Sequence, residues 1–159
     1  MTGEQTIKAF AELQKEIPKL AAIANLTAMN NLNGELHSRI FNDGKASDGS
    51  SMGKYKSNSY AKKRASRGLQ IQKKDLQFTG NLSKAIKIGV SQKELTLGIV
   101  KDERGEGLTS GKISEYQETS KQVGKTIFKP TQKELDKFNK TVTNKMTELL
   151  SKRIKELFK

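Results

Sequence analysis

The residues of this chain that are able to do chemistry are few and widely spaced. His37 is the single histidine and has neither a cysteine nor a dense acidic cluster near it in the sequence, so we interpret it as a surface or boundary residue. Asp43 and Asp48 lie in a glycine-containing segment, but they lack the alternating acidic ligands and the closing glutamate of a calcium loop. A turn-forming role is therefore favoured for both aspartates, and no metal site is predicted.

Two other patterns imitate known sites. Gly124-Lys125-Thr126 copies the end of a phosphate-binding P-loop, but Thr119 holds the position of its first glycine, and Pro130 cuts off the helix that would cradle phosphate. The acidic residues of 102–106 offer carboxylates, yet nothing in the sequence places them in a cleft, which favours a solvated loop. We therefore expect no catalytic residue and no cofactor, and we predict that the chain is not an enzyme.

Positive charge is the strongest compositional feature. The 159 residues include 30 basic and 17 acidic side chains, a formal net charge of +13, which suggests a polyanionic partner. Residues 45–74 hold nine basic residues and one acidic residue, and residues 121–159 hold eleven basic and four acidic. Lysine supplies 25 of the 30 cations, and lysine suits non-specific phosphate contact better than base reading. Sequence-specific DNA recognition is therefore not expected.

The stretch 54–74 is the main candidate functional surface. Aromatic side chains alternate there with cations, an arrangement that can stack bases and neutralise phosphates. The same stretch also fits an arm that meets acidic neighbouring proteins, or a solvated loop whose charge keeps the monomer soluble. The candidate DNA or partner contacts are Lys54, Tyr55, Lys56, Tyr60, Lys62, Lys63, Arg64, Arg67, Lys73 and Lys74.

Helices are predicted ahead of this stretch. Thr2 and Gln5 form a capping box, and apolar residues follow at spacings of three and four, which indicates an amphipathic helix. Pro18 is a possible break into a second helix that runs to about Phe41. From there the Gly-, Ser- and Lys-rich composition predicts a long basic loop or arm at about 42–77, with a helical turn around Tyr60 to Arg67.

Strand patterns follow the arm. Apolar and polar residues alternate over Ile86–Val90 and again over Leu95–Ile99, which predicts a β-hairpin with its turn at Ser91 to Glu94. Because an isolated hairpin is only marginally stable, Thr126 to Phe128 is a candidate third strand. The glycine-rich segment at about 102–112 is predicted to be a flexible loop.

The last element has the clearest pattern. Thr131 and Glu134 form a capping box after Pro130, and an apolar stripe then continues at helical spacing to the end of the chain. We expect this C-terminal amphipathic helix to pack on the hairpin sheet. The predicted fold class is thus α+β in a single domain, 1–159, with N-terminal helices, a long basic loop, a small antiparallel sheet and a C-terminal helix.

The absence of cysteine predicts neither disulfides nor thiolate metal sites. Met1 leads directly into polar residues without a hydrophobic signal core, so we expect synthesis in a cytoplasm. No stretch approaches the roughly 20 apolar residues that span a bilayer, so no membrane association is expected.

The order of features resembles the phage virion morphogenesis, or tail-completion, family, which includes head–tail joining and tail-terminator components. The resemblance extends from about residue 20 to the C-terminus and is most specific at a Thr-Gly-x-Leu segment placed before a hairpin. The residues that carry it are Phe41, Asp48-Gly49, Met52, Arg64, Leu76, Thr79, Gly80, Leu82, Tyr116, Phe128 and Pro130.

This resemblance implies a structural virion protein, made in the host bacterial cytoplasm and located in the virion neck or tail. It implies a homo-oligomeric ring that joins neighbouring phage connector or tail proteins around the DNA path, with possible non-specific contact to packaged DNA. The alternative from charge alone is a non-specific nucleic-acid-binding accessory protein.

Overall fold

The computed structural model of the protein describes residues 1–91, 94–99, 110–119 and 125–158. It confirms the α+β class, with a long N-terminal helix, a two-stranded antiparallel sheet and a long C-terminal helix. The structure divides into two compact units, and the prediction of a single domain stays a prediction. The helical unit contains Met1–Leu32 and Leu135–Lys159, and the central unit contains Asn33–Glu134.

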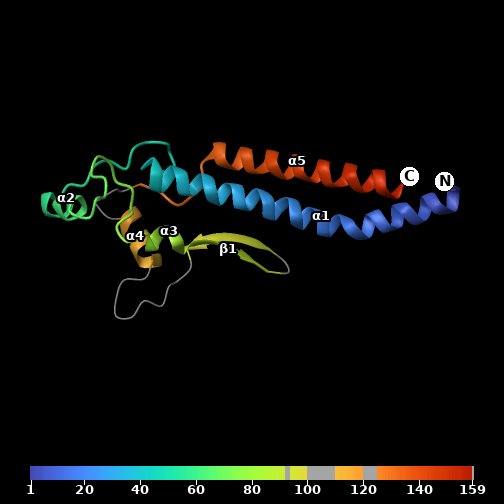
Figure 1. Cartoon of the computed structure of the whole chain (residues 1–159), viewed down its shortest axis with the longest axis horizontal. Coiled ribbons are helices and arrows are strands. Elements are labelled where there is room, and N and C mark those ends of the chain that lie inside the picture. The colour runs from blue at the N-terminus through green and yellow to red at the C-terminus, as the bar shows by residue number, and fades with distance from the viewer. Residues whose placement is uncertain (92–93, 100–109, 120–124, 159) are drawn as a thin grey trace. The chain divides into compact units, whose positions relative to one another are not determined.

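The helical unit consists of residues 3–32 of α1 (Gly3–His37) together with the length of α5 (Gln132–Leu157) that follows Glu134. Figure 1 shows the two helices side by side and antiparallel, with the N- and C-terminal ends of the chain at the same end of the pair. The predicted capping box at the start of α1 is confirmed: Thr2 N donates to Gln5 Oε1 at 2.7 Å, and Gln5 N donates to Thr2 Oγ1 at 3.3 Å.

Small side chains and one charged side chain join these helices. The buried residues of α1 in this unit include three alanines, which allow close approach of the partner helix, and the full set is Ala9, Leu13, Ala24, Ala28 and Leu32. Near the chain termini, Arg153 of α5 donates from Nε to Glu16 Oε2 at 2.7 Å and from Nη2 to Glu12 Oε1 at 2.5 Å. Phe10 and Phe158 meet edge to face, with ring centroids 4.9 Å apart.

The predicted break at Pro18 is wrong, because α1 continues through this residue. Proline inside a helix removes one backbone hydrogen bond and costs about 3 kcal/mol. Leu13 before Pro18 and Ala24 after it are both buried, so the helix is packed on either side of the proline.

At the C-terminal end of α1 the chain enters the central unit, and the α-helix gives way to a wider π-helical turn, η1 (Ser38–Asn42). Arg39, Ile40 and Phe41 of this turn are all buried. Asp43 N donates to Ser38 O at 2.9 Å, and Lys45 N donates to Arg39 O at 2.9 Å, which closes the wide turn.

The remaining elements of the central unit are short. They are α2 (Asn58–Ala65), α3 (Asn81–Ala85), β1 (Ile86–Val90), β2 (Leu95–Ile99) and α4 (Ser110–Thr119). The predicted hairpin is confirmed, with Ile86 opposite Ile99 and Val90 opposite Leu95. Ser91 N donates to Glu94 O at 2.9 Å at the predicted turn. How the C-terminal helix and the hairpin pack on each other stays a prediction.

The segment 42–77 differs from the expected extended loop. The predicted helical turn forms α2, capped by Ser57, whose side chain accepts a hydrogen bond from Tyr60 N. Backbone contacts fix the rest of the segment: Lys45 and Ser51 form an isolated antiparallel bridge, and Lys74 N donates to Gly53 O at 2.8 Å. The segment is therefore a folded part of the central unit.

Two other predictions in this region need correction. Thr126 to Phe128 forms no strand, because this segment bonds instead to the turn after α1: Ser47 N donates to Thr126 O at 2.9 Å. Of the predicted flexible loop at about 102–112, residues 102–109 lie outside the described residues, and 110–112 belong to α4.

Candidate functional site

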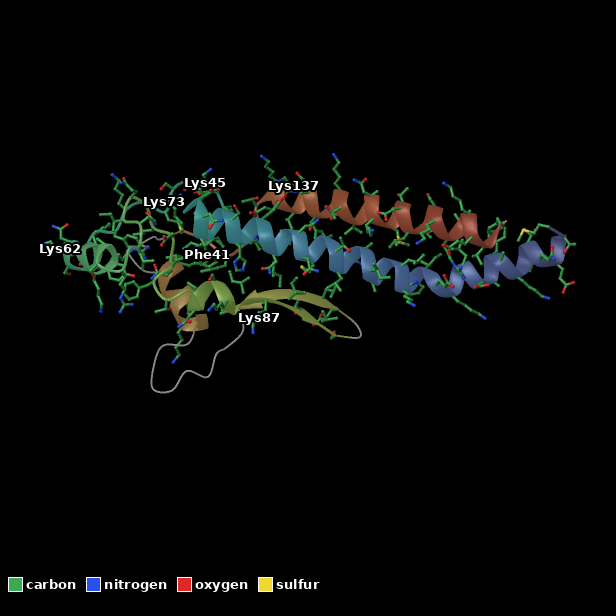
Figure 2. All side chains as sticks on the ribbon, viewed as in Figure 1. Phe41, Lys45, Lys62, Lys73, Lys87 and Lys137 are labelled. Carbon is green, nitrogen blue, oxygen red and sulfur yellow. The ribbon has the colours of Figure 1, made fainter. Side chains whose placement is uncertain are left out.

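The basic stretch divides into exposed and buried cations. Lys54, Lys56, Lys62, Lys63 and Arg67 are exposed and form what we call the basic surface. Lys62 projects from α2 into solvent in Figure 2. Their exposure leaves these side chains accessible to a partner, and their contact with one stays a prediction.

Arg64 does not belong to the basic surface, which corrects its assignment as a candidate contact. Its exposed fraction is 0%, and the guanidinium forms a bidentate ion pair in which Nη2 lies 2.9 and 3.0 Å from the two Asp75 oxygens. Its other nitrogens donate to the backbone, Nε to Gln70 O at 3.0 Å and Nη1 to Gln77 O at 2.8 Å. One buried arginine thus joins α2 to the segment from Gln70 to Gln77.

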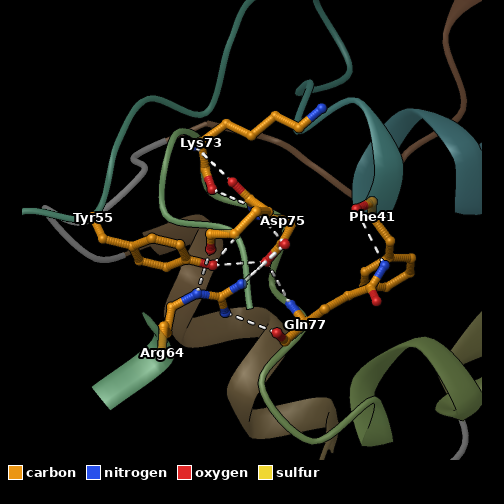
Figure 3. Close-up of polar contacts among 7 residues, drawn as sticks. Phe41, Tyr55, Arg64, Lys73, Asp75 and Gln77 are labelled. Atoms are coloured by element: carbon orange, nitrogen blue, oxygen red, sulfur yellow. Dashed lines mark hydrogen bonds and ion pairs between the residues drawn. The ribbon is translucent and has the colours of Figure 1, made fainter. Parts of the chain in front are cut away.

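Asp75 is the centre of this network, which Figure 3 shows. Besides Arg64, its carboxylate accepts from Tyr55 Oη at 2.9 Å, Gln70 Nε2 at 2.5 Å and Gln77 N at 3.0 Å. Gln77 also donates from Nε2 to Phe41 O at 3.1 Å, which connects the network to η1. Burial raises the pKa of Tyr55 well above its usual range, so this phenol stays a hydrogen-bond donor.

The last two lysines of the candidate set also differ from each other. Lys73 is half-buried, and its backbone exchanges hydrogen bonds with the Gln70 side chain. Lys74 is 4% exposed, and burial, followed by the nearby charge of Lys56, lowers its pKa. Lys74 is therefore a poor candidate for direct contact with a large polyanion.

The aromatic residues of the arm are already partnered. Tyr60 lies between Tyr55 and Phe78, with ring centroids 5.2 and 5.4 Å from its own. The Arg67 guanidinium lies 4.4 Å from the Phe78 centroid and the Arg64 guanidinium 4.5 Å from the Tyr55 centroid. Since cations within about 6 Å of a ring centroid interact with its face, these rings are not poised to stack nucleic-acid bases.

A second buried arginine holds the other half of the central unit. Arg39 of η1 donates from Nε to Glu134 Oε1 at 2.8 Å. Its Nη1 donates to Lys45 O at 3.1 Å and Ile127 O at 3.0 Å, and Nη2 donates to Lys129 O at 3.0 Å. The other Glu134 oxygen accepts from Thr131 N at 2.7 Å, and Glu134 N donates to Thr131 Oγ1 at 3.1 Å, which confirms the second predicted capping box.

The Thr-Gly-x-Leu segment forms the start of α3. Gly80 is the N-cap and has φ +73°, a left-handed conformation that favours glycine. Leu82 is 8% exposed in the core, and Thr79 Oγ1 accepts a long 3.5 Å hydrogen bond from Asn81 N. Leu76 also has a positive φ, +53°, where the chain leaves the Asp75 network. These residues shape the connection from the arm to the hairpin.

The other predicted motif residues lie around the 125–130 segment. Phe128 N and Ile127 N donate to Glu118 Oε1 of α4 at 2.9 and 2.6 Å. Pro130 is half-buried ahead of the α5 capping box. Tyr116 lies in α4, and its side chain is outside the described part of the structure.

The residues that resemble metal, phosphate or catalytic sites in the sequence have structural roles where the structure describes them. Asp48 accepts from Ser50 N at 2.8 Å, and hydrogen bonds from Ser50 hold the pKa of Asp48 below its usual range, so the turn-forming role is confirmed. Lys125 Nζ donates to Ser50 Oγ at 2.5 Å, and the His37 ring lies 5.2 Å from Phe41. Asp102, Glu103 and Glu106 lie outside the described residues. Within the described ranges, no group of three or more His, Cys, Asp or Glu side chains is arranged to hold a metal ion.

Sequence reasoning missed Arg39, Asp75 and Glu134 as the centres of buried networks. A signal for Glu134 was present, because its capping box was recognised. Arg39 and Asp75 carry no comparable local signal, since an isolated charge in a polar segment is usually exposed.

Comparison of the chain with protein-family models, with curated proteins and with solved structures finds no match. The resemblance to tail-completion proteins therefore stays a prediction. Among the described residues, no helix combines the length and the apolar character needed to cross a membrane.

Proposed function

We propose that this protein is a structural virion subunit that forms a ring at the head–tail junction or tail terminus and joins neighbouring virion proteins around the DNA path. The phage assignment rests on the order of sequence motifs. The role as an assembly subunit rests on how the chain builds its basic surface.

The observation that carries the proposal is the buried support beneath that surface. Arg64 and Asp75 hold α2, which bears Lys62 and Lys63, against the segment 70–77. A buried ion pair adds little net stability relative to an apolar core, and we infer that this one serves to fix the position of α2. The exposed cations of α2 are therefore held in place by a rigid buried support, which we call the platform, as expected of a surface that docks on a fixed partner.

The partner that fits this platform is an acidic protein neighbour. Its cations suit carboxylates as well as phosphates, and the aromatic rings beside them are covered by Arg64 and Arg67. Covered rings favour charge contact over base stacking. The half-buried Tyr60 adds apolar area beside these cations, and aromatic residues are common anchors in protein interfaces.

Reconstitution tests the proposal. The full chain is offered to neighbouring virion proteins encoded beside it, and complexes are examined by mass measurement and electron microscopy. A closed ring is expected, alone at high concentration or with the neighbour, because heterologous contacts close into rings where the rotation permits. A monomer that never joins the particle contradicts the proposal.

A second candidate, a free nucleic-acid-binding accessory protein, is favoured by the exposure of all five cations of the basic surface. It predicts strongly salt-dependent duplex DNA binding by the isolated monomer. Salt titrations of the monomer and particle-incorporation assays distinguish the two functions.

A further inference from the structure

We propose that the exposed apolar face near the start of α1 pairs with the same face of a second copy of this chain. We call this face the α1 seam. It contains the apolar residues Ile7, Phe10, Ile17 and Ala21, with Gly3 and the polar Gln14 at the remaining positions of the same spacing.

The spacing of the seam is that of a helix-pairing surface. Its residues recur alternately four and three positions apart, the heptad repeat that places side chains along one side of a helix and toward a partner helix. The buried stripe of the same unit uses other positions, Ala9, Leu13 and Ala24 among them. The seam is therefore a second apolar stripe beside the buried one, and among the described residues its Phe10 lies edge to face with Phe158, which directly follows α5 of the same chain.

The large residues of the seam are exposed. The exposed fractions are 71% for Ile7, 58% for Phe10 and 41% for Ile17. Burying such side chains contributes about 25 cal/mol per Å² of apolar surface, and contiguous exposed apolar surface of this kind marks an interaction site.

The charge pattern identifies the partner as another copy. Residues 1–32 contain three lysines and three glutamates, so this part of a chain with net charge +13 is neutral. None of the six charged residues occupies a seam position; they are Glu4, Lys8, Glu12, Lys15, Glu16 and Lys19. The seams of two cationic copies thus bring no like charges into direct contact, whereas contact between basic surfaces is repulsive. A nucleic acid or a strongly acidic protein finds no cation on the seam.

The helical unit also has a core that a second copy would complete. No apolar residue of α5 in this unit is fully buried within the described chain, and Phe138, Val142 and Met146 are all half-buried. Helix pairs of this length commonly bury their stripes in four-helix bundles. Two helical units joined through the seams would form such a bundle.

This contact goes beyond the proposed ring and does not rest on it. Identical surfaces that meet face to face join two copies and close, whereas a ring requires contacts between different surfaces. A protein that pairs through the seam but never enters a particle would contradict the proposed function alone.

The test is sedimentation equilibrium of the full chain over a wide concentration range, with Ile7→Gln, Ile17→Gln and the matched control Ile23→Gln. Ile23 is 40% exposed on the same helix but lies off the seam, so it controls for the loss of an exposed isoleucine. The wild type should associate reversibly. Each seam variant should raise the dissociation constant about tenfold or more, because an isoleucine is lost on both sides of the contact.

Ile23→Gln should leave the dissociation constant within about twofold of the wild type, as expected of a surface change outside a contact. Circular dichroism and urea unfolding of each variant establish that the helices still form. A wild type that stays monomeric at all concentrations, or equal weakening by the seam variants and the control, overturns the proposal.

Discussion

Arg39 and Glu134 are 95 residues apart in the sequence, yet Arg39 Nε donates to Glu134 Oε1 at 2.8 Å, and both side chains are less than 10% exposed. The pair connects η1 at the end of α1 with the capping box at the start of α5. It thereby fixes both ends of the central unit through one guanidinium and one carboxylate.

Arg39→Met should therefore destabilise the protein by about 3–5 kcal/mol, because it leaves the buried Glu134 carboxylate without its cation. Arg39→Lys should recover only part of this loss, since an ammonium group cannot reproduce the fork that reaches three carbonyl oxygens. Urea unfolding measures both variants. The control is Arg153→Met in the more exposed pair with Glu12 and Glu16, where a much smaller loss is expected. Equal losses at positions 39 and 153 would contradict this role for Arg39.

Substitution by glutamine should lower the free energy of unfolding strongly at Arg64 and hardly at all at its neighbours in α2. Arg64→Gln should cost about 3–5 kcal/mol, because Asp75 is then a buried and unpaired carboxylate. Lys62→Gln and Lys63→Gln should change the free energy of unfolding by no more than about 0.5 kcal/mol, since both lysines are exposed. Denaturant midpoints of the three variants test this contrast, and a neutral Arg64→Gln would refute the buried network.

Local signals predicted much of this fold. The capping boxes at Thr2 and Thr131, the hairpin and the turn that became α2 each depend on residues within a few positions of one another. The networks of Arg39 and Asp75 depend on partners brought together only by folding, so the same charges look like surface charges in the sequence. The polar sequence of α4 has no strong apolar stripe, which explains why that helix was not predicted.

Gly44 offers a test of the backbone path after η1, and Gly34 of α1 is its control. Gly44 has φ +66°, and an added Cβ would lie 2.5 Å from the Lys74 carbonyl oxygen. Gly44→Ala should thus cost at least about 1 kcal/mol, because both the conformation and the space exclude a side chain. Gly34→Ala, inside α1 with nothing within 4 Å of the added atom, should instead stabilise by about 0.5–1 kcal/mol. Thermal unfolding of the two variants measures both signs, and a stabilising Gly44→Ala would rule out this path.

Tyr55 should resist ionisation in the folded protein. Burial raises its pKa above the value of about 10 in the unfolded chain, so the native state retains a proton that the unfolded state releases. The contribution of Tyr55 to stability is complete below about pH 10 and is lost as the pH rises toward the folded pKa. Ultraviolet titration should show that the Tyr55 phenol ionises only at higher pH or on unfolding. Tyr55→Phe should remove that late step, and a late step that persists in this variant would assign it to another tyrosine.

The basic surface can be tested without disturbing its support. Replacing Lys62, Lys63 and Arg67 by glutamine removes three exposed cations and leaves Arg64 with Asp75, so the fold should be preserved. If these side chains bind phosphates, the slope of log K against log salt concentration on duplex DNA should fall by about 0.9 for each lost contact, or roughly 3 units in all. If they bind an acidic virion neighbour, DNA affinity should barely change while incorporation into particles fails. Lys8→Gln and Lys19→Gln on α1 are controls that lower the net charge outside this surface. A triple variant that binds DNA normally and assembles normally would leave the basic surface without a partner and defeat both readings.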